Sequence, residues 1–217
     1  MNKTHILFDL DGTLTDPGMG ITNSVMHALT HFGITVTNRS DLYRFIGPPL
    51  MDSFMEYYGL TEEQAVEAVR VYREYFADRG WAENTVYSGI EALLADLVAA
   101  GKMLLVATSK PQIFAERILV HFGLDKYFTH ICGVALQAPR GYSKADVIRD
   151  ALDRAGVSDL TTAVMVGDRH HDIDGAKVVG ISSVGVLYGY GDREEHEAAC
   201  ADVIVESVDE LRTALLS

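Results

Sequence analysis

The chain is poor in cysteine, with only Cys132 and Cys200 among its 217 residues. The two cysteines lie far apart and show no CxxC spacing, so the sequence indicates neither a disulfide framework nor a zinc site. A chain of this kind suits a reducing compartment best, and we expect it in the cytoplasm.

Positive charge is also scarce, because 18 lysine and arginine residues face 31 aspartate and glutamate residues. The formal net charge of -13 would repel nucleic acid and anionic membrane surfaces across most of the molecule. We therefore expect no nucleic acid polymer and no membrane as a partner. An anionic substrate would need a local positive site.

Long hydrophobic runs are missing as well. The apolar run at residues 4–8 meets charged residues far too soon for a signal segment or a membrane span, so we expect no export. The 48% of hydrophobic residues still suffice for a sizeable core and a smaller accessory domain, which argues against overall disorder.

The apolar pattern changes twice along the chain. Residues 4–8 predict a buried strand, whereas residues from about 16 to 83 carry apolar side chains at helical spacing. Beyond Tyr87, helical stripes alternate with short β-rich runs, as a series of βαβ units requires. These later strands are predicted at residues 103–107, 130–134, 163–166, 183–187 and 203–205. The pattern predicts an α/β protein with a doubly wound, mainly parallel sheet and a helical insertion after the first strand.

Ligands of open α/β sheets bind at the carboxyl ends of the strands, so the residues that follow each strand are candidates for a site. Asp9 and Asp11 follow the first strand and point the same way if the chain is extended. Thr108 and Ser109 follow the second, where hydroxyl and backbone N–H groups suit phosphate oxygens.

Two further strand ends carry charged groups of complementary type. Lys144 begins the helix after the third strand, where an ammonium group could neutralise both a carboxylate and a phosphate. Asp168 and Asp172 follow the fourth. Carboxylates packed together would repel one another, and a hard divalent cation relieves that cost, so Mg²⁺ is the natural ligand.

Simpler explanations exist for several of these residues. Thr108 and Ser109 could only cap the following helix, and Lys144 could be an exposed helix lysine. His170 and His171 stand beside the fourth strand end, but adjacent loop histidines are more often exposed than liganding, so we leave them out of the metal site.

Aromatic residues raise two further questions. The stripe Tyr72, Tyr75 and Phe76 is better explained as core of the helical insertion than as a platform for stacking a base. The loop at residues 188–191 follows a late strand and is expected near the rim of the site, without an assigned role.

Taken in order, the motifs DxDGT at residues 9–13, Thr108, Lys144 and GDxxxD at residues 167–172 span the whole chain. Their order and types resemble the haloacid dehalogenase superfamily of phosphohydrolases. The resemblance implies a Rossmann-like catalytic core, residues 1–15 and 84–217, with a helical cap domain at residues 16–83. The GPPL at residues 47–50 and the GDRHHD motif look like the phosphoglycolate phosphatase and 5'-nucleotidase branch.

The same resemblance implies a role for each matched residue. Asp9 would be the nucleophile and would form an aspartyl-phosphate, with Asp11 as general acid and base. Asp9, Asp168 and the carbonyl group of Asp11 would hold Mg²⁺, and Asp172 would either contact the metal or anchor its ligands. The phosphoryl group would be bound by Thr108, Ser109 and Lys144.

We therefore expect a magnesium-dependent phosphomonoester hydrolase, either a monomer or a weak homodimer. Its substrate would be a small phosphorylated metabolite, resembling a 5'-nucleotide or phosphoglycolate. An acid at Asp11 favours phosphate ester chemistry, because the dehalogenases and transport ATPases of the superfamily lack one there. A phosphomutase acting on a sugar phosphate and a non-catalytic phosphate-sensing module remain as alternatives.

Overall fold

The computed structural model describes residues 1, 3–135 and 141–217. The chain divides into two compact units. The first, which we call the sheet unit, consists of Met1–Thr15 and Val86–Ser217. The second, the helical unit, is Asp16–Thr85. Among the described residues, every helix falls short of the length and apolar character that a membrane crossing demands.

The sheet unit is built on a six-stranded sheet in which every neighbouring pair of strands is parallel. The spatial order is β5-β4-β1-β6-β7-β8. In chain order the strands are β1 (His5–Phe8), β4 (Met103–Pro111), β5 (His130–Val134), β6 (Ala163–Gly167), β7 (Ser182–Val186) and β8 (Val203–Val205). The chain first fills the sheet on one side of β1 and then on the other. The carboxyl ends of β4, β1 and β6 therefore meet at the point where the winding reverses, which is where open α/β sheets bind ligands.

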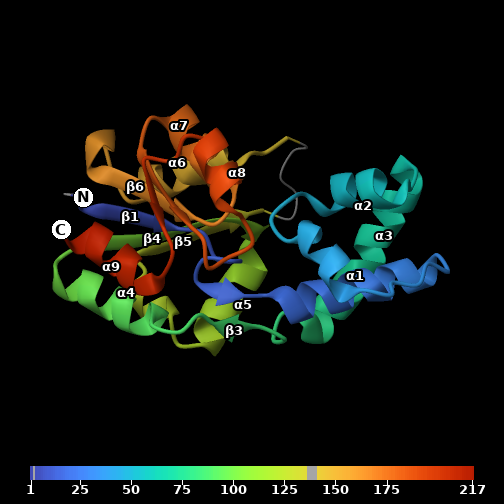
Figure 1. Ribbon diagram of the computed structural model, residues 1–217. Helices are drawn as coiled ribbons and strands as arrows, with labels where there is room; N and C mark the ends of the chain where they lie inside the picture. Colours follow the sequence, from blue (N-terminus) through green and yellow to red (C-terminus); the bar gives the residue numbers. More distant parts are fainter. Residues whose placement is uncertain (2, 136–140) are drawn as a thin grey trace. The chain divides into compact units, whose positions relative to one another are not determined.

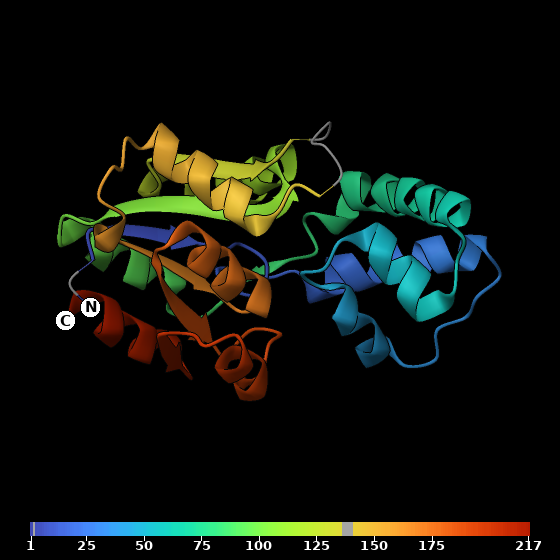
Figure 2. The same ribbon diagram turned by 90° about the horizontal axis from the view of Figure 1, so that it is seen from above.

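Helices cover both faces of this sheet (Figures 1 and 2). One face is covered by α6 (Lys144–Arg154) and α7 (His170–Val179), and the other by α4 (Ile90–Ala99), α5 (Gln112–His121) and α9 (Val208–Leu216). A short helix, α8 (Arg193–Ala198), follows β7. Residues 6–8 of β1, 104–107 of β4 and 163–166 of β6 are all apolar and buried, as expected for strands covered on both faces. The doubly wound α/β fold expected from the sequence is confirmed.

The second predicted strand proved longer than its apolar run. We expected it to end at Ala107, but β4 continues to Pro111, which pairs with Val134 of β5. The register shifts between Ala107 and Pro111, so the strand carries an irregularity just beyond its buried part. This extension places Lys110 on a strand, three residues beyond the predicted end.

The helical unit contains α1 (Gly18–His31), a 3-10 helix (Arg39–Phe45), α2 (Leu50–Tyr58), α3 (Glu62–Tyr75) and a π-helix (Phe76–Gly80). A Cβ atom on Gly20 would lie 1.9 Å from the carbonyl oxygen of Gly80, so this close approach of two backbones requires glycine. Tyr72 and Phe76 are buried and stack with ring centroids 5.6 Å apart, as expected for core residues. Two short strands that the sequence did not predict, β2 (Thr15–Asp16) and β3 (Thr85–Val86), pair where the chain passes between the units.

Candidate active site

A tight turn after β1 begins the candidate site. The backbone N–H groups of Thr13, Leu14 and Thr15 all donate to the carbonyl oxygen of Leu10, and Gly12 adopts a positive φ of 80°. A Cβ atom on Gly12 would lie 2.0 Å from Oδ2 of Asp168. The turn therefore requires glycine for its backbone angle and also for the approach of the β6 carboxylate.

Three carboxylates converge beside this turn: Asp9 follows β1, Asp168 follows β6, and Asp172 lies in the first turn of α7. Oxygen atoms of Asp9, Asp168 and Asp172 lie within 4.8 Å of one another, and all three residues are buried. Asp168 accepts a hydrogen bond from the backbone N–H of Tyr190 at 2.9 Å, and Asp172 accepts one from the N–H of Arg169 at 3.2 Å. These bonds fix the orientation of the two carboxylates.

Burial dominates the electrostatics of these acids. It raises the pKa of Asp168 well above the ordinary value, and the negative charges of Asp172 and Asp9 raise it further. Burial also raises the pKa of Asp172 and of Asp11, although Lys144 and Lys110 respectively oppose the shift. Without a bound cation, the clustered carboxylates are therefore hard to ionise together.

Lys144 is a buried cation that contacts two of these three carboxylates. Its Nζ lies 2.9 Å from Oδ1 of Asp9 and 2.7 Å from Oδ1 of Asp172, and it donates to the carbonyl oxygen of Ala107 at 3.1 Å. Burial alone would lower the pKa of Lys144, but the two carboxylates outweigh it and raise the pKa above the ordinary value. The alternative of an exposed helix lysine is wrong, because only 7% of the residue is exposed.

Local structure explains why Lys144 reaches this position. Ser143 and Asp146 form a reciprocal capping box that fixes the first turn of α6, where Lys144 is the first residue. Gly175 of α7 leaves room for the lysine stem, since a Cβ atom there would lie 2.9 Å from Cγ of Lys144. The lysine therefore extends between α6 and α7 toward the strand ends.

A second buried lysine, which our sequence reasoning did not single out, contacts Asp11. Nζ of Lys110 lies 2.5 Å from Oδ2 of Asp11, and the side chain of Lys110 is only 5% exposed. The signal was present in the alternation along β4, since residues two apart on a strand share a face and Lys110 follows Thr108 by two. We had assigned only backbone and hydroxyl groups to this segment.

The two predicted phosphate-binding hydroxyls lie in different surroundings. Thr108 is buried and accepts the backbone N–H of Lys110 at 3.2 Å, so its hydroxyl hydrogen remains to be donated. Ser109 is exposed. Both residues lie on β4 at the carboxyl end of the sheet, beside the carboxylates.

The loop after β7 packs on Asp168 more closely than we expected for a rim loop. Cβ atoms on Gly189 and Gly191 would lie 2.4 Å from Cβ and 2.0 Å from the carbonyl oxygen of Asp168. The hydroxyl of the half-buried Tyr188 donates to the carbonyl oxygen of Thr13 at 3.1 Å, which joins the loop to the turn after β1. The loop thus shields the carboxylates from bulk water.

The adjacent histidines do not join the carboxylate cluster. Nδ1 of His170 lies 3.0 Å from Asp174 within the same helix, and burial lowers the pKa of His171 to about 4. The group of potential metal ligands found among the described residues contains neither histidine.

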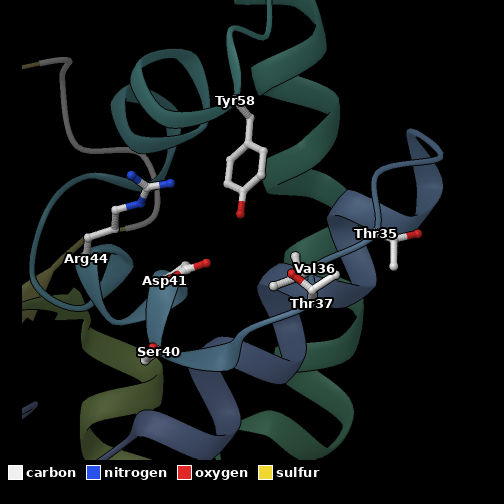
Figure 3. Close-up of a pocket in the computed structure, with 7 residues that line it drawn as sticks. All are labelled: Thr35, Val36, Thr37, Ser40, Asp41, Arg44 and Tyr58. Atoms are coloured by element: carbon white, nitrogen blue, oxygen red, sulfur yellow. The ribbon is translucent and has the colours of Figure 1, made fainter.

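A separate hollow of about 520 Å³ lies in the helical unit (Figure 3). Figure 3 shows the hydroxyl of Tyr58 and the carboxylate of Asp41 extending into the same space. All of its lining residues are exposed or half-buried: Thr35, Val36, Thr37, Ser40, Asp41, Arg44 and Tyr58. A solvated hollow of this kind lacks the buried charges of the sheet unit, so we place the candidate active site at the strand ends.

A doubly wound parallel sheet with buried acids and a buried lysine at its switch point defines an α/β enzyme core. The chain belongs to the haloacid dehalogenase-like hydrolase family, whose model matches residues 6–186. The family resemblance expected from the motifs is confirmed.

Several relatives align with nearly the whole chain. A 5'-nucleotidase of Pseudomonas aeruginosa is 47% identical over 92% of this chain and 91% of its own length. The tyrosine-protein kinase PtkA of Mycobacterium tuberculosis is 44% identical over 97% of this chain and 72% of its own length. The crystal structure of a predicted phosphatase from Clostridium acetobutylicum is 48% identical, covers 100% of this chain and 99% of its own, and superposes with a TM-score of 0.93.

These relatives confirm that the chain is an enzyme of the phosphatase type. More distantly, a phosphoglycolate phosphatase of Agrobacterium fabrum is 31% identical over 96% of this chain. Both branch names expected from the sequence therefore occur among the relatives.

Proposed function

We propose that this protein is a Mg²⁺-dependent phosphomonoester hydrolase that acts on a small phosphorylated metabolite through an aspartyl-phosphate on Asp9. The observation that carries the proposal is the buried cluster of Asp9, Asp168 and Asp172, in which Asp9 and Asp172 contact Nζ of Lys144. In this proposal residues 1–15 and 84–217 form the catalytic core, and residues 16–83 form the helical cap domain.

The donor set fits a hard divalent cation. The four carboxylates of Asp9, Asp11, Asp168 and Asp172 outnumber the two buried lysines, Lys110 and Lys144, that contact three of them in the described part of the chain. Oxygen-only ligands with surplus negative charge suit Mg²⁺. Asp9, Asp168 and the main-chain carbonyl of Asp11 would hold it, with Asp172 as a further ligand or an anchor. When bound, the ion supplies positive charge that orients and polarises the phosphoryl group.

The chemistry divides into two steps. A carboxylate oxygen of Asp9 attacks phosphorus, the ester P–O bond breaks, and Asp11 gives its proton to the departing oxygen. Water then attacks the same phosphorus while Asp11 takes a proton from it, and the bond between phosphorus and Asp9 breaks to release phosphate. Both aspartates return to their starting states.

Charge and hydrogen bonding would hold the phosphoryl group during these steps. The Thr108 hydroxyl has a hydrogen to donate, and Ser109 is exposed where a phosphate oxygen could approach. Lys144 neutralises Asp9 and the incoming phosphate together, which lowers the repulsion between nucleophile and substrate.

The final phosphoryl acceptor is the point on which other functions differ. A phosphomutase would pass the phosphoryl group to a sugar hydroxyl, and the name of the PtkA relative points to a tyrosine acceptor. Each would share the phosphorylated Asp9. Water is the acceptor favoured by the relatives named 5'-nucleotidase and phosphoglycolate phosphatase.

The test combines a substrate panel with trapping of the phosphorylated enzyme. Purified protein with Mg²⁺ is assayed on 5'-nucleotides, sugar phosphates, 2-phosphoglycolate and p-nitrophenyl phosphate, and phosphate release is measured. Quenched samples are digested, and the peptide that contains Asp9 is weighed by mass spectrometry. We expect hydrolysis and a peptide heavier by one phosphoryl group.

The variant Asp9→Asn should fold normally but lose turnover, because an amide is nearly isosteric with the carboxylate yet a poor nucleophile. Asp153→Asn, at an exposed position of α6, serves as the matched control and should keep full activity. Undiminished turnover by Asp9→Asn would move the nucleophile elsewhere and overturn the proposal.

A further inference from the structure

Lys110 enters the candidate site from the irregular end of β4. Along this segment Thr108 and Lys110 are buried while Ser109 between them is exposed, as the two-residue period of a strand requires. The side chain of Lys110 is thereby directed inward although it lies beyond the part of β4 that pairs with β1.

The backbone at Lys110 is held firmly against β5. A Cβ atom on Gly133 would lie 2.6 Å from the carbonyl oxygen of Lys110, so the two strands approach more closely than other residues would allow. Gln112 secures the same region, because its side chain accepts from the N–H of Gly133 at 2.5 Å and donates to the carbonyl oxygen of Ile131 at 2.8 Å. Lys110 therefore starts from a rigid base.

The ammonium group of Lys110 contacts one carboxylate oxygen of Asp11 but not the other. Nζ lies 2.5 Å from Oδ2. Oδ1 of Asp11 is buried and accepts no hydrogen bond from any described residue. A buried carboxylate oxygen without a donor is costly, and such an atom marks a place where another group is expected to bind.

The two buried lysines have separate tasks. Lys144 contacts Asp9 and Asp172, whereas the carboxylate that Lys110 contacts is Asp11. Removal of one lysine therefore leaves the other set of contacts in place. The effect of Lys110 on Asp11 can therefore be tested in a protein that keeps Lys144.

We infer that Lys110 is a positioning residue for Asp11, and that Oδ1 of Asp11 is the atom that exchanges a proton with the substrate. The inference rests on the proposed function, because it needs Asp11 to act as acid and base. Lys110 holds Oδ2, which fixes the rotation of the carboxyl group and directs Oδ1 toward the reacting phosphoryl group. Lys110 itself gives up no proton in either step.

The proton balance follows from this arrangement. In the first step the proton on Oδ1 moves to the ester oxygen as the P–O bond breaks, and an alcohol leaves. In the second step Oδ1 takes a proton from the attacking water as the new P–O bond forms and the bond to Asp9 breaks. Lys110 remains bonded to Oδ2 throughout, so both transfers use the same oxygen.

Two substrates with different leaving groups distinguish a badly positioned acid from a general loss of structure. Nitrophenolate departs without a proton, whereas the alkoxide of an alkyl phosphate requires one. We therefore compare p-nitrophenyl phosphate with an alkyl phosphate that the panel shows to be turned over, in the full-length protein with Mg²⁺. The variant is Lys110→Met, which keeps the length of the stem and removes the charge.

For Lys110→Met we expect kcat on the alkyl phosphate to fall about 10- to 100-fold, part of the 10²- to 10⁴-fold that acid–base catalysis contributes. The first turnover of p-nitrophenyl phosphate should stay within about threefold of the parent protein and appear as a burst, since only the later hydrolysis needs Asp11. Lys110→Arg should recover part of the alkyl phosphate rate. Lys126→Met, at an exposed lysine of the same unit, should leave the rates on both substrates unchanged.

A double-mutant comparison decides whether Lys110 acts through Asp11. Once Asp11→Ala has removed the acid, adding Lys110→Met should lower kcat by less than about threefold further, because residues that act as a unit are not additive. The inference is overturned if the loss of kcat in the double variant equals the product of the losses in the two single variants. It is also overturned if folded Lys110→Met loses kcat equally on both substrates.

Different results would contradict the proposed function and the role of Lys110. A parent protein that forms no phosphorylated Asp9 contradicts the proposed function itself. A second result would contradict only the role of Lys110. In that result the parent forms phosphorylated Asp9 and Asp11→Ala selectively loses activity on the alkyl phosphate, but Lys110→Met does not.

Discussion

The ammonium group of Lys144 lies 2.9 Å from the carboxylate of Asp9, with both side chains almost wholly buried. A buried ion pair of this kind is costly to form but more costly to break, because the remaining charge loses a compensating partner in a medium of low polarity. The nucleophile that we propose is thus supplied with a permanent positive neighbour before any substrate arrives.

Replacement of Lys144 by alanine should therefore weaken both phosphate binding and rate. We expect kcat/KM to fall by roughly 10²-fold or more, as for removal of a preorganised electrostatic group from an active site. The measurement is steady-state kinetics together with inorganic phosphate as a competitive inhibitor, whose Ki should rise. Lys177→Ala, at an exposed lysine on α7, is the control, and unchanged kinetics in Lys144→Ala would make that lysine dispensable.

Magnesium dependence is the second expectation. Chelation should abolish turnover, added Mg²⁺ should restore it, and Ca²⁺ should inhibit because the larger ion tolerates irregular and higher coordination. Mg²⁺ should also raise the melting temperature, since a ligand that binds only the folded state stabilises it.

The thermal shift gives a readout independent of activity. Asp168→Asn should lose most of the Mg²⁺-induced increase in melting temperature, whereas Asp153→Asn should keep it. Full activity after exhaustive chelation would contradict the metal assignment.

Gly189 provides a test of the packing around Asp168. An added methyl group would lie 2.3 Å from the carbonyl oxygen of Gly12 and 2.4 Å from Cβ of Asp168, so neighbouring backbone must move. We expect Gly189→Ala to destabilise the fold by about 1–3 kcal/mol, as overpacking usually does, and to lower activity by displacing the Asp168 carboxylate. Denaturant unfolding measures the first effect.

Gly156→Ala is the contrasting variant, because nothing lies within 4 Å of an added Cβ and only its positive φ of 67° is unfavourable. It should cost on the order of 1 kcal/mol and leave activity unchanged. Equal activity of the two alanine variants would show that the loop does not support the site.

His196 predicts a dependence of stability on pH. The residue is fully buried, its Nε2 donates to the carbonyl oxygen of Val186 at 3.2 Å, and burial lowers its pKa. The unfolded chain therefore takes up a proton below about pH 6.5 that the folded chain resists, so stability should fall as pH drops below that value.

Melting temperatures at pH 7.5 and 5.5 measure the effect. His196→Gln keeps a donor but has no titration, so it should lose less stability on acidification than the parent, while carboxylates contribute equally to both. His121→Gln, at an exposed position, should retain the dependence of the parent. Identical pH dependence in His196→Gln would exclude His196 as the source.

Much of this architecture can be predicted from the sequence, because the spacing of apolar residues and the polar residues at strand ends are local signals. The alternation of apolar runs beyond Tyr87 predicts parallel strands, and parallel strands bring their carboxyl ends to one edge. Asp9 and Asp168 could be assigned to one site for that reason, since β1 and β6 are neighbours in the sheet.

Residues whose place depends on tertiary packing escaped prediction. Lys110 lies beyond the apolar run that predicted the strand, and the pairing of Pro111 with Val134 extends the strand past it. The contact of Gly189 with Asp168 joins residues from different strand ends. The close approach of two backbones produces no periodic pattern in the sequence. The presence of a glycine therefore does not reveal which distant residue it contacts.

Asp11 is proposed to act as acid in the first step and base in the second, and the choice of leaving group separates these two tasks. Asp11→Ala given p-nitrophenyl phosphate should still phosphorylate Asp9, because nitrophenolate leaves without a proton. Hydrolysis should then slow for lack of a base. Nitrophenol should therefore appear in a burst of roughly one equivalent per active site, followed by slow turnover.

An alkyl phosphate should give almost no burst with the same variant, because its leaving oxygen needs the proton that Asp11 supplies. Stopped-flow absorbance follows nitrophenol, and rapid quench follows the alcohol. Asp153→Ala, which removes an exposed carboxylate of the same unit, should behave as the parent with both substrates. If folded Asp11→Ala with Mg²⁺ turns over both substrates at undiminished steady rates, proton transfer belongs to another group, and the contact between Lys110 and Asp11 has only a structural role.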